Sequence, residues 1–197
     1  MSHAPPPRPT RESSQTASAD GVRRSSVEVS ALEPDWSRER LAPGEWSPGK
    51  RLLGCLRAYQ RLAGQSGLLC ALRRRVIVLR HRFWSAVSGA DIPLNCNIGG
   101  GLLIPHPNGI VIHPHASIGP NCLIFQQVTL GTLAQGGTPV LGGHVDLGAG
   151  AKILGNVRIG DHAVVGANAV VLHDVPARAV AVGIPAVSRV CAEGRRE

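Results

Sequence analysis

A histidine and an aspartate near the middle of the chain have the residue types of a general base and its partner. His106 lies in the stretch Ile-Pro-His-Pro-Asn-Gly-Ile, residues 104–110. An imidazole titrates near neutral pH and can take a proton from a hydroxyl group. A carboxylate would have to hold its tautomer, and Asp91 is the only acidic residue between Glu45 and Asp146. By spacing alone, a surface histidine and an aspartate that caps a junction are equally good interpretations.

A six-residue period surrounds this histidine. From Ile92 to Pro176 an aliphatic residue recurs every six positions, and the residue four positions later is usually small. Only two interruptions break the register, at Ile110–Val111 and at residues 131–140. The repeat starts are Ile92, Ile98, Ile104, Ile112, Ile118, Ile124, Leu130, Leu141, Leu147, Ile153, Ile159, Val165 and Val171.

This period predicts the fold class. It fits neither a helix at 3.6 residues per turn nor an alternating strand. It is typical of a solenoid whose coil has three short flat sides, with about 18 residues per turn. Each coil buries its aliphatic interior only by stacking on its neighbours. We therefore expect a mainly β protein, a stack of a little over four coils, in which the break at Ile110 forms a ledge where a ligand could sit beside His106.

Two different segments precede the repeat. Residues 1–48 are rich in Pro, Ser and Ala and hold seven of the thirteen acidic residues, which predicts a disordered extension. An organelle transit peptide fits less well, because such peptides avoid acids. Residues 49–90 contain eight arginines and no acid, and leucines at helical spacing predict two helices separated by a break at residues 64–67. We expect this hairpin to cap the open end of the solenoid; the alternative is a basic helix that touches an anionic membrane surface or an acidic partner.

Composition excludes several classes of protein. Five cysteines without a CxxC pair argue against a disulfide framework and a zinc ribbon, and Cys96 and Cys122 fall at interior repeat positions. No apolar run approaches the length of a membrane span, and no secretory signal is evident, so we expect a cytoplasmic protein. The net charge of +8 is concentrated in the helical segment without interleaved aromatic residues, so nucleic acid is not an expected partner.

Five stretches between residues 90 and 190 match a known family in their order and spacing. They are Asp91–Ile92, Pro107–Val111, Gln127–Gly131, Gly148–Asn156 and Ala181–Ala186. In these stretches the chain resembles the serine acetyltransferase group of hexapeptide-repeat acyltransferases. The resemblance implies that residues 91–190 form a left-handed parallel β-helix, an exception to the usual right-handed crossover rule, followed by a tail at 191–197. It also implies homotrimers or dimers of trimers, with acetyl-CoA in a groove between adjacent subunits, no metal, and a place in cysteine biosynthesis.

The resemblance also assigns roles to individual residues. His106 matches the family's catalytic base and Asp91 its carboxylate partner, which implies direct transfer of an acetyl group to an acceptor hydroxyl, with backbone N–H groups holding the oxyanion. The CoA arm is expected along the later coils, with residues 183–185 closing over it. The expected contacts are Gly148, Ala149, Lys152, Gly166, Gly183, Ile184 and Pro185.

Departures from the family pattern bear on the acceptor. Pro105 and Pro93 stand where the family has an aspartate and a histidine, and Gly137–Thr138 replace the Arg-His pair that grips the amino-acid carboxylate. The candidate substitutes for acceptor binding are His113, His144 and Gln127. The family relationship favours L-serine as the small-molecule acceptor, whereas the lost pair favours a sugar hydroxyl of a surface polysaccharide.

Two hypotheses from other classes remain. One is a zinc enzyme of the carbonic anhydrase type, which also occurs on left-handed β-helices and would take three imidazoles. The expected His-x4-His pair is missing, and the available histidines are His106, His113, His115, His144 and His162. The other is a non-catalytic scaffold, for which the coincidence of Asp91, His106 and the CoA-type loop would be accidental.

Overall fold

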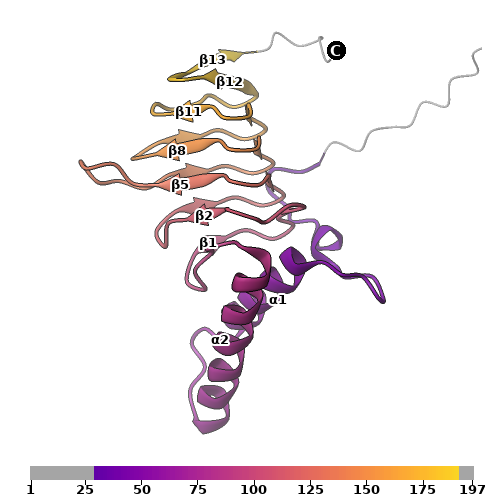
Figure 1. Cartoon of the computed structure of the whole chain (residues 1–197). Coiled ribbons are helices and arrows are strands. Elements are labelled where there is room, and N and C mark those ends of the chain that lie inside the picture. The colour runs from indigo at the N-terminus through magenta and orange to yellow at the C-terminus, as the bar shows by residue number, and fades with distance from the viewer. Residues whose placement is uncertain (1–28, 191–197) are drawn as a thin grey trace, which may run out of the picture.

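The computed structural model describes residues 29–190 and consists of a helical hairpin followed by a stack of flat coils (Figure 1). A short 3-10 turn, Trp36–Glu39, precedes helices α1 (Pro48–Arg61) and α2 (Leu68–Ser88). The strands are β1 (Asn97–Ile98), β2 (Val111–Ile112), β3 (Ser117–Ile118), β4 (Leu123–Ile124), β5 (Thr129–Gly131), β6 (Val140–Leu141), β7 (Asp146–Leu147), β8 (Lys152–Leu154), β9 (Arg158–Ile159), β10 (Val164–Val165), β11 (Val170–Val171), β12 (Ala179–Gly183) and β13 (Ala186–Val190).

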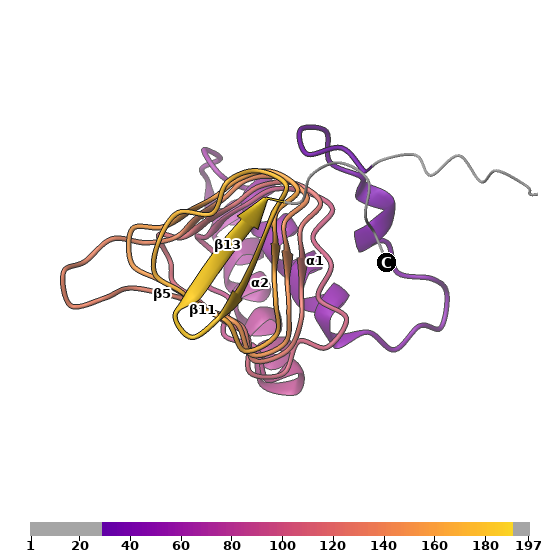
Figure 2. The same cartoon turned by 90° about the horizontal axis from the view of Figure 1, so that it is seen from above.

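These strands form the three flat sides of a parallel β-helix. The sheet orders are β1-β3-β6-β9, β11-β8-β5-β2 and β13-β12-β10-β7-β4, so successive strands as far as β12 fall in different sheets. All neighbours are parallel except β12 and β13, which form an antiparallel hairpin at the last coil. The coils nearly superimpose when the stack is seen from above (Figure 2). The six-residue period therefore corresponds to one side of a coil, as the sequence predicts.

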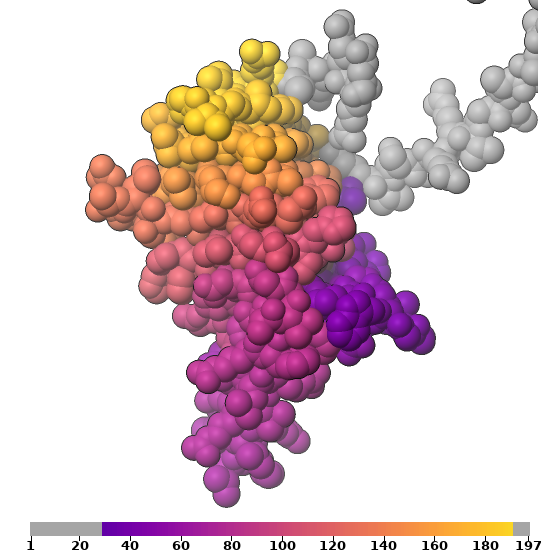
Figure 3. Space-filling view, in the orientation of Figure 1, coloured from indigo at the N-terminus to yellow at the C-terminus, as the bar shows by residue number. Residues whose placement is uncertain are grey.

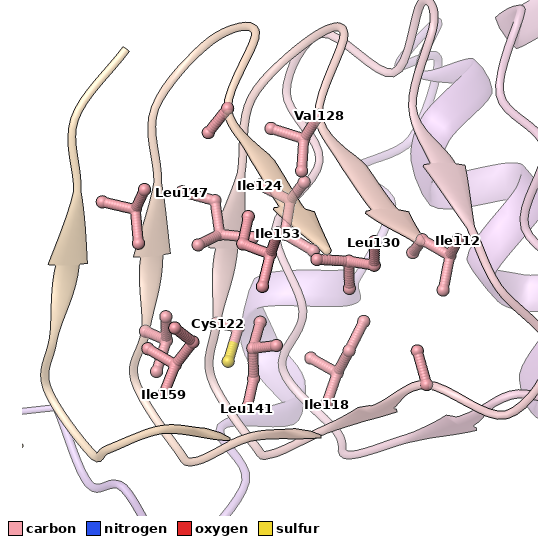
Figure 4. Packing of buried hydrophobic residues seen from close by; sticks show 14 of the residues in the cluster. Ile112, Ile118, Cys122, Ile124, Val128, Leu130, Leu141, Leu147, Ile153 and Ile159 are labelled. Atoms are coloured by element: carbon pink, nitrogen blue, oxygen red, sulfur yellow. The ribbon is translucent and has the colours of Figure 1, made fainter. Parts of the chain in front are cut away.

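Aliphatic side chains fill the interior of the coils. Every repeat start is at most 5% exposed, and neighbouring coils align these side chains in columns, as with Ile118, Leu141 and Ile159 (Figure 4). The small residues that follow, including Cys96 and Cys122, are buried as well. Removing a large side chain from such a core costs roughly 2–5 kcal/mol, so the stack is held mainly by this column packing.

Three columns of turns join the sides. Corner I comprises residues 105–110, 125–128, 148–151 and 166–169; corner II comprises 93–96, 113–116, 131–139, 155–157 and 172–174; corner III comprises 99–102, 119–122, 142–145, 160–163 and 176–178. Several corners need a positive φ, which glycine and asparagine adopt most readily. At corner III the column of such residues is Gly101, Asn121, His144, His162 and Arg178.

The helical hairpin closes the first coil. Leu52, Leu53 and Leu56 of α1 are each 1% exposed and join the same core as Ile92 and Ile104. A Cβ at Gly49 would lie 2.7 Å from the carbonyl oxygen of Ile104, so α1 approaches the coil closely. The expected cap and its two helices are confirmed. No helix within the part of the chain that the structure describes has the length and apolarity needed to cross a membrane.

The segment before α1 differs from the prediction of a disordered extension over residues 1–48. Residues 29–40 lie along corner III, where the buried side chain of Asn121 bonds the backbone of Ser30, Glu33 and Asp35. We call residues 29–40 the strap. Sequence composition missed it because its partners are far along the chain. Residues 1–28 of the predicted extension and the predicted tail at 191–197 lie outside the described residues.

Candidate active site

The loop that carries His106 is the widest turn of corner I. It spans residues 105–110, six residues, whereas 125–128, 148–151 and 166–169 have four each. The side chain of Ile110 is fully buried and anchors the end of the loop in the core. The two extra residues therefore bulge outward at Pro105–Gly109, and the ledge expected from the break in the repeat is present.

Hydrogen bonds hold this loop from both sides. Gly109 N–H donates to the carbonyl oxygen of Gly89 at 2.7 Å, which ties the loop to the end of α2. Gln127 N–H donates to the carbonyl oxygen of Asn108 at 2.9 Å, which ties it to the second coil. His106 thus lies on a loop of fixed backbone, although its own side chain is exposed to solvent.

Asp91 lies at the edge of the sheet next to the end of the His106 loop. Its N–H donates to the carbonyl oxygen of Ile110 at 2.8 Å, and its carbonyl oxygen accepts from Ile112 N–H at 2.9 Å. The structure thereby places Asp91 beside the last residue of the loop that carries His106. Within residues 29–190 no hydrogen bond joins the two side chains, which are both exposed. Catalytic hydrogen bonds are often long in unliganded enzymes and tighten when substrate binds.

The residues expected to contact CoA lie along the same corner. Gly148, Ala149 and Gly166 follow β7 and β10 at corner I, directly above the turn at Gln127. The turn of the β12–β13 hairpin, residues 183–185, occupies the equivalent position in the last coil, because Val165 pairs with Ala181. The expected contacts therefore form one column that begins at the His106 loop.

Close stacking explains the glycines of this column without any ligand. A Cβ at Gly148 would lie 2.6 Å from Ala167 N, and a Cβ at Gly166 would lie 2.7 Å from Val182 Cγ1. Lys152 on β8 is the cation of the column, and its Nζ donates to the carbonyl oxygen of Gln127. An ammonium group held at this corner is placed to meet an anionic or polar ligand that lies along the column.

The structure adds one residue that the sequence did not single out. Gln126, in the second turn of corner I, has a buried side-chain Oε1 without a hydrogen-bond partner among residues 29–190. Buried polar atoms are rarely left unpaired, so such an atom near the His106 loop is a candidate acceptor for a ligand donor or an ordered water. Its neighbour Gln127 drew attention instead because it belongs to a matching stretch of the family.

The other candidate histidines lie at different corners. His113 is at corner II next to His115, whose N–H donates to His113 Nδ1 at 3.2 Å. His144 is at corner III, with its Nδ1 2.9 Å from that of His162. The structure therefore does not bring His113 or His144 beside His106 within one chain. Among residues 29–190 no group of three histidines, cysteines or acids has the geometry to hold a metal, so the zinc hypothesis finds no ligand set there.

The extended turn of corner II, residues 131–139, is uncharged. It is joined to the preceding turn by hydrogen bonds from Thr138 Oγ1 to His115 O at 3.1 Å and from Ser117 N–H to Pro139 O at 3.1 Å. Gly137 packs within this turn against Asn156. The turn thus offers hydroxyl and backbone groups but no cation to a ligand.

Serine acetyltransferases of several bacteria have similar sequences. The bacterial transferase hexapeptide model, of six repeats, matches residues 138–173. A serine acetyltransferase of Helicobacter pylori is 43% identical over 161 residues, which cover 78% of this chain and 91% of that protein. A serine acetyltransferase of Synechococcus elongatus is 46% identical over 102 residues, covering 50% of this chain and 42% of that protein. The chain thus spans nearly all of the first relative but less than half of the second.

Solved structures agree with these relatives. Soybean serine acetyltransferase complexed with serine superposes with a TM-score of 0.62 at 39% identity, covering 72% of this chain and 57% of the soybean chain. A serine acetyltransferase in complex with CoA superposes with a TM-score of 0.59 at 33% identity, covering 73% of this chain and 58% of that one. These matches confirm the expected fold, a left-handed β-helix of hexapeptide repeats.

Proposed function

This chain belongs to the serine acetyltransferase family, and on that premise we propose that it transfers an acetyl group from acetyl-CoA to the hydroxyl group of L-serine. The product pair would be O-acetylserine and CoA, as expected for an enzyme of cysteine biosynthesis. The observation that carries the proposal is the His106 loop, which is held by the backbone next to Asp91 at the start of corner I.

His106 is the proposed general base and Asp91 its positioning carboxylate. The imidazole takes the proton of the acceptor hydroxyl while the oxygen attacks the thioester carbonyl carbon. The carbon–sulfur bond then breaks, and the sulfur of CoA leaves with the proton that the imidazolium returns. Asp91 stabilises the imidazolium and sets which ring nitrogen faces the acceptor. The reaction needs no metal, because the thioester is already activated.

Acetyl-CoA is proposed to lie along corner I. The pantetheine arm would lie against the outer surface of the turns at Gly148, Ala149 and Gly166, and the turn at residues 183–185 would cover its far end. The ammonium group of Lys152 would contact a polar or phosphate group of CoA. We propose that a second copy lines the other side of this groove, in a homotrimer or a dimer of trimers.

The acceptor pocket would be completed by corner I and by a neighbouring copy. Gln126 and Gln127 lie in the turn above His106 and are proposed contacts of the acceptor. His113 and His144 lie at other corners, so they would reach the acceptor only from an adjacent subunit. This arrangement would give L-serine polar partners without a cation on the extended turn of corner II.

That uncharged turn favours a second candidate function, acetylation of a sugar hydroxyl. A free amino acid carries a carboxylate, whose burial without a cation is costly, whereas a sugar carries only neutral hydroxyl groups. Residues 131–139 present such neutral groups. The same His106 chemistry would serve both acceptors, so only the acceptor distinguishes the two candidates.

The test is release of CoA from acetyl-CoA by the purified full chain, with L-serine or with neutral sugars as acceptor. We expect turnover that depends on L-serine and falls roughly 10²–10⁴-fold in His106→Ala, as for loss of a general base. Asp91→Asn should fall less, because the imidazole remains. His115→Ala, an exposed histidine at corner II, is the matched control and should keep full activity.

Each outcome has a distinct meaning. Full serine-dependent turnover in His106→Ala would remove the proposed base. Turnover with a neutral sugar but not with L-serine, again lost in His106→Ala, would establish the second candidate function. Absence of turnover with every acceptor, together with absence of acetyl-CoA binding, would favour the non-catalytic scaffold.

A further inference from the structure

Helix α2 presents a continuous apolar stripe to solvent. The stripe residues recur at intervals of three and four, so they fall on one face of the helix. Between 42% and 73% of each of these residues is exposed to solvent, whereas apolar residues that pack against the rest of a protein are mostly buried. We call this face the outer stripe; it consists of Leu69, Leu72, Val76, Leu79, Phe83 and Val87.

The fold of the chain does not use the outer stripe. The opposite face of α2 packs against the rest of the protein through buried Cys70 and Ser88 and through Trp84, which contacts the core. On this inner face, the ring nitrogen Nε2 of His81 also lies 2.8 Å from the carbonyl oxygen of Ile92. α2 thus packs on the protein through one face and exposes apolar side chains on the opposite face, and the hairpin projects from the end of the coil stack (Figure 3).

Arginines line both edges of the outer stripe. Arg73 and Arg80 lie seven residues apart on one edge, and Arg75 and Arg82 lie seven apart on the other. All four are exposed, and residues 51–90 contain no acid that could pair with them along the helix. The two ion pairs found among residues 29–190, Lys50–Glu45 and Arg57–Glu39, involve other side chains. The stripe is therefore an apolar surface with a positive border.

We propose that the outer stripe of α2 docks on the surface of a lipid bilayer that contains anionic lipids. The apolar side chains would enter the boundary between headgroups and acyl chains, and the arginines on both edges would extend to lipid phosphates. Each basic residue near an anionic surface adds to the attraction. The helix would lie in the plane of the surface, with its inner face on the protein, rather than cross the bilayer.

Electrostatic repulsion opposes the simplest alternative, in which the outer stripe of a second copy of this chain packs against the outer stripe of the first. Pairing two copies through their outer stripes would place arginines of one helix opposite arginines of the other at the flanking positions, where coiled coils carry their attractive pairs. No acid of residues 51–90 offsets this repulsion. An anionic bilayer, by contrast, supplies negative charge along both edges at once.

Docking would bring the candidate active site to the bilayer. Val87 ends the stripe and Asp91 follows four residues later, so their Cα atoms lie within roughly 14 Å of each other. Gly89, between them, bonds the His106 loop through Gly109. The membrane proposal rests on α2 alone and does not depend on the proposed acetyl transfer.

The test is flotation of the full chain with vesicles in a density gradient. We compare vesicles of phosphatidylcholine alone with vesicles of equal parts phosphatidylcholine and phosphatidylglycerol. We expect flotation only with the anionic vesicles, and weakening as salt is raised, because exposed charges are screened. Arg75→Gln/Arg82→Gln should lower the partition coefficient roughly 30-fold, which corresponds to about 1 kcal/mol for each arginine.

Matched variants make the result decisive. Leu72→Gln/Leu79→Gln should lower binding at least about tenfold while far-ultraviolet circular dichroism stays unchanged, because both side chains are more than half exposed in the folded chain. Arg158→Gln/Arg189→Gln removes the same charge from exposed sites on the coils and should bind as wild type.

Three outcomes would overturn the proposal. These are no flotation with anionic vesicles, equal flotation with both vesicle types, and a loss of binding in the coil variant as large as that in the α2 variants. Absence of flotation with a smaller oligomer for Leu72→Gln/Leu79→Gln in light scattering would assign the stripe to a second copy. Absence of flotation with an unchanged oligomer would leave an acidic protein partner as the occupant.

Discussion

The strap should be released from the coils by a single substitution at Asn121. This side chain is 1% exposed, its Oδ1 accepts from Asp35 N–H at 2.7 Å, and its Nδ2 donates to the carbonyl oxygens of Ser30 and Glu33, both at 2.7 Å. Its φ is +60°, a conformation that glycine adopts without strain. Asn121→Gly therefore removes three hydrogen bonds while leaving the corner itself possible.

The size of the effect follows from those three bonds. A net contribution of about 1 kcal/mol for each gives about 3 kcal/mol, or a roughly 100-fold larger open population of the strap. The loss should be local, because a second anchor remains where Glu39 bonds Arg57 and the N–H of Leu102. The midpoint of global unfolding should therefore change less than the opening of the strap.

Amide hydrogen exchange with peptide-level mass spectrometry measures this opening. We expect exchange of residues 29–37 to accelerate roughly 100-fold in Asn121→Gly, while peptides from the coils keep their protection. The matched control is Asn168→Gly, which also has positive φ, +56°, but is exposed and lies on corner I away from the strap. Equal exchange of residues 29–37 in wild type and Asn121→Gly would refute the assignment of Asn121 as the anchor.

Three further predictions concern stability and reactivity. Arg57→Ala should destabilise the chain by about 3–5 kcal/mol in urea unfolding, because it leaves the buried carboxylate of Glu39 without its cationic partner. Exposed Arg61→Ala is the control, and equal urea midpoints for the two variants would contradict this prediction. Burial raises the pKa of Cys96 to about 11 and that of Cys122 to about 12, so a thiol reagent at pH 8 should label neither until the chain unfolds. Burial also raises the pKa of Asp146. A carboxyl with a raised folded-state pKa lowers the free energy of unfolding of the protein as pH rises from the unfolded-state pKa through the folded-state pKa. Asp146→Asn should therefore be the more stable form at pH 7, with an advantage that disappears below about pH 4; an advantage that grows in acid would have the wrong sign.

The amino-acid sequence by itself determined the repeat architecture. Each six-residue repeat forms one side of a coil, and the same pattern of aliphatic and small residues recurs on every side. The buried positions can therefore be predicted from the local sequence, without knowledge of any distant contact. The interior positions of Ile124 and Cys122 and the bulge at the His106 loop follow from this local rule. The helical cap follows from a second local pattern, the helical spacing of the leucines before the repeat. The likeness to the family then assigned roles to Asp91 and His106.

The tertiary structure decided what the period leaves open, because a solenoid sets neither what lies against its outer faces nor which distant segment will bond to a given corner. The strap reaches Asn121 from Ser30, 91 residues away, so composition alone predicted disorder for a segment that is packed. His113 and His144 are both at corners, yet only the winding of the chain shows that they share no corner with His106. The helical spacing of α2 is also visible in the sequence. Which of its faces packs inward depends on how the hairpin docks against the first coil, and this docking leaves the outer stripe exposed.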